Sequence, residues 1–201
     1  MTKKVFLSSF ITIAYCMICY SQKGDTVKNY LNFPTTINFE NKEYTLIASS
    51  HPSSNYYKQD YIVLSEKDSN FNTKIYFEVS FDNIAISDIV NKKVAAIERQ
   101  KNEKTIVERN IYRKDGAFMI HFMILKLSED KESAISASRY VNLFKSVKDK
   151  KTGKDGIILF GFAASSKGQD YDDPDIVINA MRDYLLKDIT SFKIPEILLI
   201  E

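Results

Sequence analysis

The chain has 201 residues, of which 44% are hydrophobic and 27% charged, with 28 basic side chains against 26 acidic ones. A chain of this length can bury a sizeable apolar core as one domain, without disulfides or metals to hold it together. The near balance of charge argues against nucleic-acid binding, which depends on lysine and arginine neutralising phosphates.

The first 21 residues have the layout of a secretory signal peptide. Lys3 and Lys4 form a basic start, an apolar run follows from Val5 to about Ile18, and a small residue, Ser21, precedes Gln22. The run is shorter than the roughly 20 apolar residues that a membrane span needs. We therefore expect removal of residues 1–21 and a mature protein that is periplasmic or secreted, with 26 basic and 26 acidic side chains.

Both cysteines, Cys16 and Cys19, lie inside this leader. The processed chain would then have no disulfide and no thiol for catalysis. Lipid attachment at one of the two cysteines is the alternative to plain secretion. A bacterial lipoprotein signal has a small residue before the modified cysteine, whereas Tyr15 and Ile18 stand there. Lipid anchoring is therefore not favoured.

Residues 22–36 are polar and are interpreted as an N-terminal tether, followed by a single domain over residues 37–201. Alternating apolar residues and flanking turn residues predict strands in this domain. Hairpin turns are predicted at Asn41-Lys42 and, more strongly, at Lys114-Asp115-Gly116. The predicted strands cover residues 37–40, 43–47, 56–64, 72–81, 105–113, 117–127, 138–147 and 157–164.

Two amphipathic helices are predicted. The first runs from an N-cap at Ser87 to about Gln100. The second opens at Asp173-Pro174, where proline suits the first helical position. The apolar tail, residues 197–200, is too short to span a membrane, so we expect it to pack on the domain.

The strands predicted over residues 118–125 and 157–163 are apolar on both faces, so both faces must be covered. This pattern predicts an α+β fold. It consists of a twisted, mostly antiparallel sheet of about six to seven strands, with helices covering both faces.

The order of hairpin, strands, helix, antiparallel meander and closing helix resembles the PsbP-like sandwich superfamily, and in particular the DcrB-type envelope proteins of bacteria. The likeness covers about residues 37–192, and it rests on element order, the Lys114-Asp115-Gly116 hairpin and the helix from Pro174. The resemblance implies a non-enzymatic accessory role toward a protein partner. No binding residue of that superfamily matches a motif here, so none is carried over.

Only two histidines are available for acid–base chemistry. His121 lies in an apolar strand and is interpreted as a core residue with a satisfied hydrogen bond. His51 precedes Pro52 in a predicted loop, and nothing nearby marks it as a base. The segment Gly153-Lys154-Asp155-Gly156 lacks the order of a phosphate-binding loop and is interpreted as a hairpin turn. We therefore assign no catalytic and no cofactor-binding residue.

Metal binding has one candidate, the acidic cluster Asp170, Asp172, Asp173 and Asp175. Calcium prefers several carboxylate ligands, but the cluster lacks the spacing of an EF-hand. Acidic residues also gather before a helix N-terminus because the helix dipole favours negative charge there. We prefer this second interpretation and assign no metal site.

Two surface features remain. Tyr56, Tyr57 and Tyr61 form either part of an interface or ordinary half-buried strand positions. A basic group near residue 150 is interpreted as a solvated hairpin tip rather than a binding patch. That group is Lys148, Lys150, Lys151 and Lys154.

Together these observations predict an exported, non-enzymatic binding or accessory protein without a cofactor, whose partner is another protein of the cell envelope. An immunity or inhibitor protein against a toxin or lytic enzyme is an alternative. A third hypothesis is an envelope hydrolase with a site assembled in space around His51 or His121.

Overall fold

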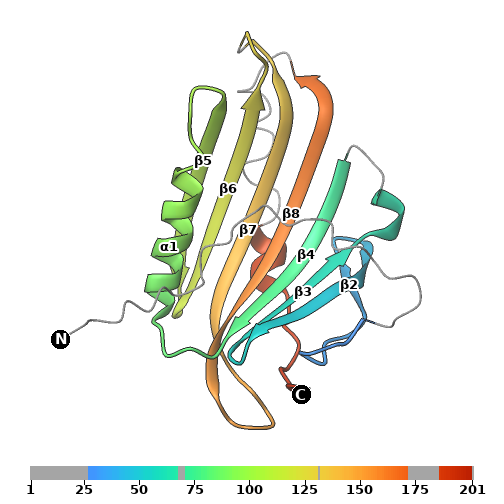
Figure 1. Ribbon diagram of the computed structural model, residues 1–201, viewed down its shortest axis with the longest axis vertical. Coiled ribbons are helices and arrows are strands. Elements are labelled where there is room, and N and C mark those ends of the chain that lie inside the picture. Colours follow the sequence, from blue (N-terminus) through green and yellow to red (C-terminus); the bar gives the residue numbers. More distant parts are fainter. Residues whose placement is uncertain (1–26, 68–70, 131, 172–185, 201) are drawn as a thin grey trace, which may run out of the picture.

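The structure is a computed structural model that describes residues 27–67, 71–130, 132–171 and 186–200 (Figure 1). Eight strands form one antiparallel sheet in the order β1-β2-β3-β4-β8-β7-β6-β5. The strands are β1 Thr36–Phe39, β2 Lys42–Ser53, β3 Tyr56–Ile62, β4 Phe71–Ser80, β5 Thr105–Lys114, β6 Ala117–Leu127, β7 Ala134–Lys148 and β8 Asp155–Tyr171. The described helices are α1 Ile86–Glu98, the 3-10 turn η1 Leu64–Glu66 and α3 Leu186–Ser191.

The turns of both predicted hairpins contain residues with positive φ. Asp115 and Gly116 have φ values of 50° and 76° and join β5 to β6, which confirms the hairpin predicted there. The first turn lies one residue earlier than expected, at Glu40 and Asn41 with φ values of 52° and 59°. Phe39 therefore pairs with Lys42, which is the first residue of β2 rather than part of the turn.

The predicted strands are confirmed, and three of them are longer than expected. β2 continues to Ser53 and so contains His51, which composition had assigned to a loop. β7 and β8 both begin earlier and end later than the predicted ranges 138–147 and 157–164. The first helix is also confirmed, although its N-cap is Ala85 rather than Ser87. The second predicted helix lies mostly outside the described residues, which resume at Leu186 in α3.

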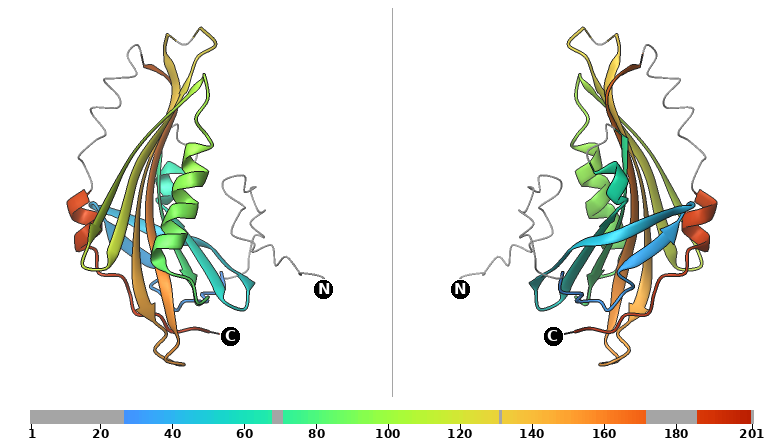
Figure 2. Two further views of the ribbon diagram at one scale, coloured as in Figure 1. Left: turned by 90° about the vertical axis from the view of Figure 1, so that its left-hand side faces the viewer. Right: turned by 90° about the vertical axis from the view of Figure 1, so that its right-hand side faces the viewer.

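The expected α+β sandwich with helices on both faces is wrong. The molecule is a mostly antiparallel half-barrel of eight strands, with only two short helices among its described residues. The sheet curls until β1 lies over its own central strands (Figure 2). The Phe39 ring of β1 contacts the rings of Phe160 and Phe162 of β8 at centroid distances of 5.9 and 5.6 Å. Part of the inner face of the sheet is therefore covered by a strand, where the sequence predicted a helix.

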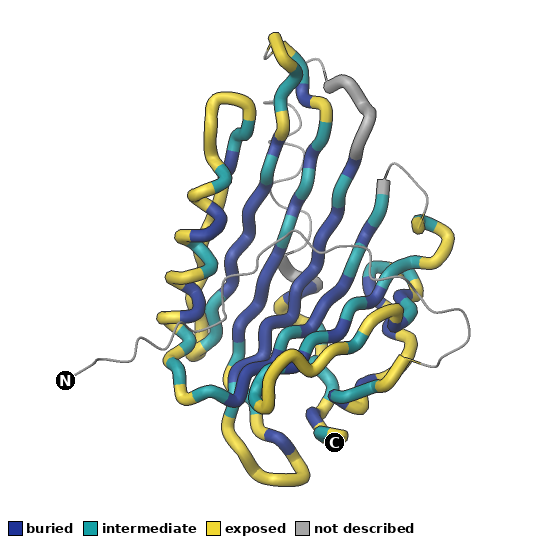
Figure 3. The backbone as a smooth tube through the Cα atoms, in the orientation of Figure 1, coloured by how far each residue is buried: buried dark blue, intermediate teal, exposed yellow. Residues whose placement is uncertain are grey.

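The inner face of the half-barrel holds the larger core. Phe77 of β4 and Phe160 of β8 stack at 5.2 Å, and Phe192, just after α3, stacks on Phe160 at 4.4 Å. On the outer face, α1 buries Ile89, Val90 and Ile97 against a second cluster that includes Phe122 and Leu159. The two-sided burial predicted for the central strands is therefore confirmed, and Figure 3 shows it concentrated in the middle of the sheet.

Both ends of the described chain pack on the half-barrel. Residues 27–35, the described part of the expected tether, bury Leu31 and Phe33 in the inner core. The C-terminal tail lies beside them, since the Leu198 N–H donates to Leu31 O at 3.3 Å. Asp149 holds this tail in place by accepting a hydrogen bond from the Leu199 N–H at 3.2 Å. The prediction that the tail packs on the domain is confirmed.

Within the described chain, neither α1 nor α3 combines the length and the apolar composition that crossing a bilayer requires.

Candidate interaction surface

The structure does not bring the two histidines into one site. His51 is exposed on β2, where its ring stacks on Tyr57 at a centroid distance of 4.2 Å and tilts against Tyr30 at 5.6 Å. His121 is buried on β6, opposite Asn110 of β5 and Val141 of β7. Four strands separate β2 from β6 in the sheet, so a site that combines both imidazoles is not formed.

The three tyrosines do not form a common surface. Tyr57 and Tyr61 are buried in the inner core, and burial raises the pKa of the Tyr61 hydroxyl above its usual range. Tyr56 points to the opposite side of β3 and donates a hydrogen bond to Glu78 Oε2 at 2.8 Å. The cluster therefore consists of alternating strand positions, and its interface interpretation is not supported.

The lysines near residue 150 belong to the β7–β8 hairpin, as expected. Lys148 Nζ lies 3.4 Å from Asp155 Oδ1, and Lys150 Nζ lies 3.0 Å from Glu196 Oε1. Lys154 donates to Asn55 Oδ1 at 2.7 Å. Because these three ammonium groups are partnered, the hairpin is not a strong anion-binding patch. Gly153 has a φ of 71° in the turn itself, which explains the glycine there.

The proposed calcium cluster is not described structurally. Asp172, Asp173 and Asp175 lie outside the described residues, and so does the side chain of Asp170. Among the residues that are described, no group of three or more histidine, cysteine, aspartate or glutamate side chains is placed to hold a metal ion.

A chain of polar groups links β2, η1 and β4. The Tyr44 hydroxyl donates to Thr73 Oγ1 at 3.0 Å, and that hydroxyl donates to Glu66 Oε2 at 2.7 Å. Glu66 also accepts from the Thr73 N–H at 2.8 Å and pairs with Lys42 Nζ at 2.5 Å. Burial tends to raise the pKa of the Glu66 carboxyl, but these hydrogen bonds outweigh it and the pKa is lowered. Burial raises the pKa of Tyr44 to about 12.

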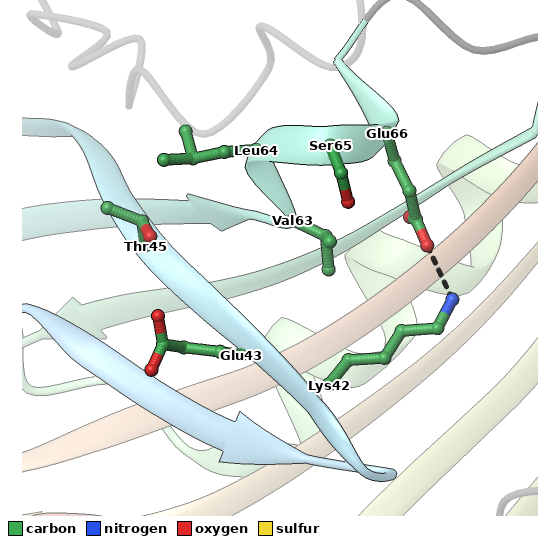
Figure 4. A pocket seen from close by; sticks show the side chains of 7 residues that line it. All are labelled: Lys42, Glu43, Thr45, Val63, Leu64, Ser65 and Glu66. Carbon is green, nitrogen blue, oxygen red and sulfur yellow. Dashed lines mark hydrogen bonds and ion pairs between the residues drawn. The ribbon is translucent and has the colours of Figure 1, made fainter.

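An open groove of about 410 Å³ lies beside this polar chain (Figure 4). Its Lys42 and Glu66 are paired with each other, and its Leu64 side chain is 58% exposed. The lining contains two carboxylates, of which Glu66 is already engaged by Lys42 and Thr73. Its lining residues are Lys42, Glu43, Thr45, Val63, Leu64, Ser65 and Glu66.

Arg139 is a cation enclosed by the fold. It lies on β7 and is only 6% exposed, and its Nε has no hydrogen-bond partner among the described residues. Burial lowers the pKa of the guanidinium, and the negative charge of Glu40 partly offsets this. Burying a cation without full hydrogen bonding costs stability, so Arg139 is a costly core residue.

The most accessible recognition element is the edge strand β5. It pairs with β6 from Thr105 to Lys114, and on its other side no described strand is bonded to it. From Glu108 onward every residue of β5 is exposed, including the large side chains Ile111 at 43% and Tyr112 at 41%. α1 packs on one face of the sheet next to this edge (Figure 2), and its Glu98 pairs with Arg109 of β5. The backbone edge itself is therefore accessible.

The other edge of the sheet is protected. β1 is only four residues long, and the chain before it continues along β2, where the Leu46 N–H donates to Thr35 O at 2.8 Å. The Tyr30 N–H adds a bond to Ser49 Oγ at 3.4 Å. Of the two edges of the described sheet, the one formed by β5 is thus the long and accessible one. Such an edge can pair with a strand of another chain.

Sequence reasoning found β5 as a strand but missed its position at an edge. One signal was available: the segment from Arg109 to Lys114 carries three cations, which central strands seldom do.

Comparisons with known proteins add one finding. A search of curated proteins and a search of solved structures both found no match. The resemblance to the PsbP-like superfamily therefore stays a prediction. The model of one protein family matches residues 31–194, which is most of the chain and nearly all of the half-barrel. The chain belongs to this family, which is itself uncharacterised.

Proposed function

We propose that the protein is exported and acts as a non-enzymatic binding or accessory protein on another protein of the cell envelope. The long accessible edge of β5 is the observation that carries the binding role, because it presents backbone donors and acceptors beside exposed Ile111 and Tyr112. The leader-like residues 1–21 support export. The hydrolase hypothesis, with a site around His51 or His121, gains no comparable support, because His51 stacks on Tyr57 and His121 is buried in β6.

Export is tested by expressing the full chain in a bacterial host, fractionating the cells and sequencing the N-terminus of the purified protein. We expect a periplasmic or secreted product that begins at Gln22. The control is the double variant Ile11→Asp/Ile13→Asp, which interrupts the apolar run and should keep the chain in the cytoplasm with residue 1 retained. A wild-type product that begins at Met1 and fractionates with the cytosol would contradict export.

Binding is tested by using the purified mature protein to capture partners from a native envelope extract, followed by mass spectrometry. We expect saturable capture of a protein, unchanged in the variants His51→Ala and His121→Ala. A single tight partner with lytic or toxic activity that is lost on binding would identify the inhibitor alternative. The proposal would be overturned in favour of a hydrolase by two results together. No protein would be captured, and the purified protein would hydrolyse an envelope component in a reaction that His51→Ala or His121→Ala abolishes.

A further inference from the structure

We infer that β5 is a docking strand for an extended, acidic segment of the partner protein, which adds to the sheet as a further antiparallel or parallel strand. The inference rests on the proposed binding function and names the site and the chemistry of its partner. In this mode, main-chain hydrogen bonds supply affinity and side chains on alternate positions supply specificity.

The geometry of β5 suits strand addition. Ten consecutive residues pair in register with β6 and hold β5 extended, with no bulge along this pair. The β6–β7 and β7–β8 pairs continue behind it and make the edge part of a large rigid sheet. Binding of a partner strand would therefore lose little conformational entropy in β5 itself, because that strand is already ordered.

The side chains along the edge define what can bind there. The six residues from Arg109 to Lys114 contain three cations and no acid. Arg109 is paired with Glu98 of α1, whereas Arg113 packs over the Phe118 ring at 5.1 Å and Lys114 is exposed. The charges of Arg113 and Lys114 are therefore the ones presented to a partner. Opposite charges on neighbouring strands stabilise their pairing.

A second copy of this chain matches the edge less well than an acidic segment does. If two β5 strands paired antiparallel about Ile111, Glu108 of one copy would lie opposite Lys114 of the other, but Arg109 would lie opposite Arg113. Like charges directly opposite each other destabilise a strand pair, and cationic side chains are a common protection of edges against self-association. A partner strand with acidic side chains on either side of Ile111 and Tyr112 avoids this repulsion. Its central residues can then cover both of these large side chains.

The test uses a defined probe, a fluorescent peptide of about ten residues in which pairs of glutamates flank a central pair of valines. Fluorescence anisotropy measures its binding to the mature protein, and hydrogen exchange locates it. We expect saturable binding that slows exchange of β5 amides. The variant Arg113→Glu/Lys114→Glu should weaken binding by about tenfold or more. The matched variant Lys28→Glu/Lys193→Glu, at exposed lysines outside β5 and its neighbour β6, should bind as wild type.

A peptide with lysine in place of glutamate is the specificity control and should not bind. Equal binding of the two peptides, protection outside β5, or unchanged binding by Arg113→Glu/Lys114→Glu would overturn the inference. Sedimentation of the free protein as a dimer with protected β5 amides would also overturn it, because a second copy would then occupy the edge. Circular dichroism and thermal melting check folding, and the single variant Lys114→Glu serves if the double variant does not fold.

The extract experiment separates this inference from the proposed function. Capture of a specific partner that Arg113→Glu/Lys114→Glu retains would refute β5 docking and leave the binding function standing. Probe binding at β5 with no partner captured from any envelope extract would support the edge site and count against the function.

Discussion

The Tyr76 hydroxyl donates a hydrogen bond to the Asn142 side-chain oxygen across an intervening strand. Tyr76 of β4 pairs with Gly161 of β8, and Asn142 of β7 pairs with the same glycine from the other side. The tyrosine ring therefore lies flat over the glycine. A Cβ at Gly161 would stand 2.1 Å from the Tyr76 ring, which leaves no room for any other residue. Three strands of the central sheet are joined at this point by one side chain.

Gly161→Ala should destabilise the protein by about 1–3 kcal/mol, because the added methyl group overpacks against Tyr76. Chemical denaturation measures the free energy of unfolding. In a Tyr76→Ala background the same substitution should cost much less, because the ring that it meets is gone. An equal cost in both backgrounds would show that backbone conformation, rather than the ring, requires glycine.

Glu66→Gln should lower stability near pH 7 by about 1 kcal/mol, because the amide keeps acceptors for Thr73 but loses the charge that pairs with Lys42. The pKa of Glu66 is lowered by folding from its ordinary value of 4.5. Its contribution is therefore complete above that value and is lost as the pH falls through the lower, folded-state pKa.

Unfolding free energies measured from pH 7 down to pH 3 should show the gap between wild type and Glu66→Gln closing below about pH 4.5. Glu43→Gln is the matched control, on the same strand as Lys42 but exposed, and should show little gap at any pH. A gap that stays constant down to pH 3 would mean that ionisation of Glu66 does not stabilise the fold.

Ile197→Ala should cost about 2–5 kcal/mol, because Ile197 is 2% exposed and anchors the C-terminal tail in the inner core. The neighbouring residue provides the control. Leu198 is 40% exposed, so Leu198→Ala should change stability by no more than about 0.5 kcal/mol. Equal effects of the two substitutions in thermal or chemical denaturation would contradict the packing of the tail.

Arg139→Met should be neutral or should stabilise the protein by about 1–4 kcal/mol, because it replaces a buried guanidinium with an apolar side chain of similar length. Arg113→Met on the exposed strand β5 is the comparison and should not stabilise. A loss of several kcal/mol in Arg139→Met would show that the guanidinium makes a stabilising interaction beyond the attraction of Glu40.

Local sequence signals predicted most of the strands and one hairpin turn correctly. The Asp115-Gly116 turn was readable because its two residues tolerate positive φ. The β1–β2 turn was misplaced by one residue because Glu40 carries no such signal, and pairing of Phe39 with Lys42 decides its position. The proposed docking strand was only half predicted: β5 was recognised as a strand, but its position at an edge depends on which strands pair.

The sequence by itself determined the alternation of apolar residues, the turns and the need to cover both faces of the strands β6 and β8. Only the tertiary structure decided what covers them. Twist and curl accumulate across eight strands until Phe39 of β1 lies on Phe160 and Phe162 of β8, so the inner face is closed largely by the sheet itself. Apolar periodicity reports that a face is buried, but it carries no information about which distant segment buries it.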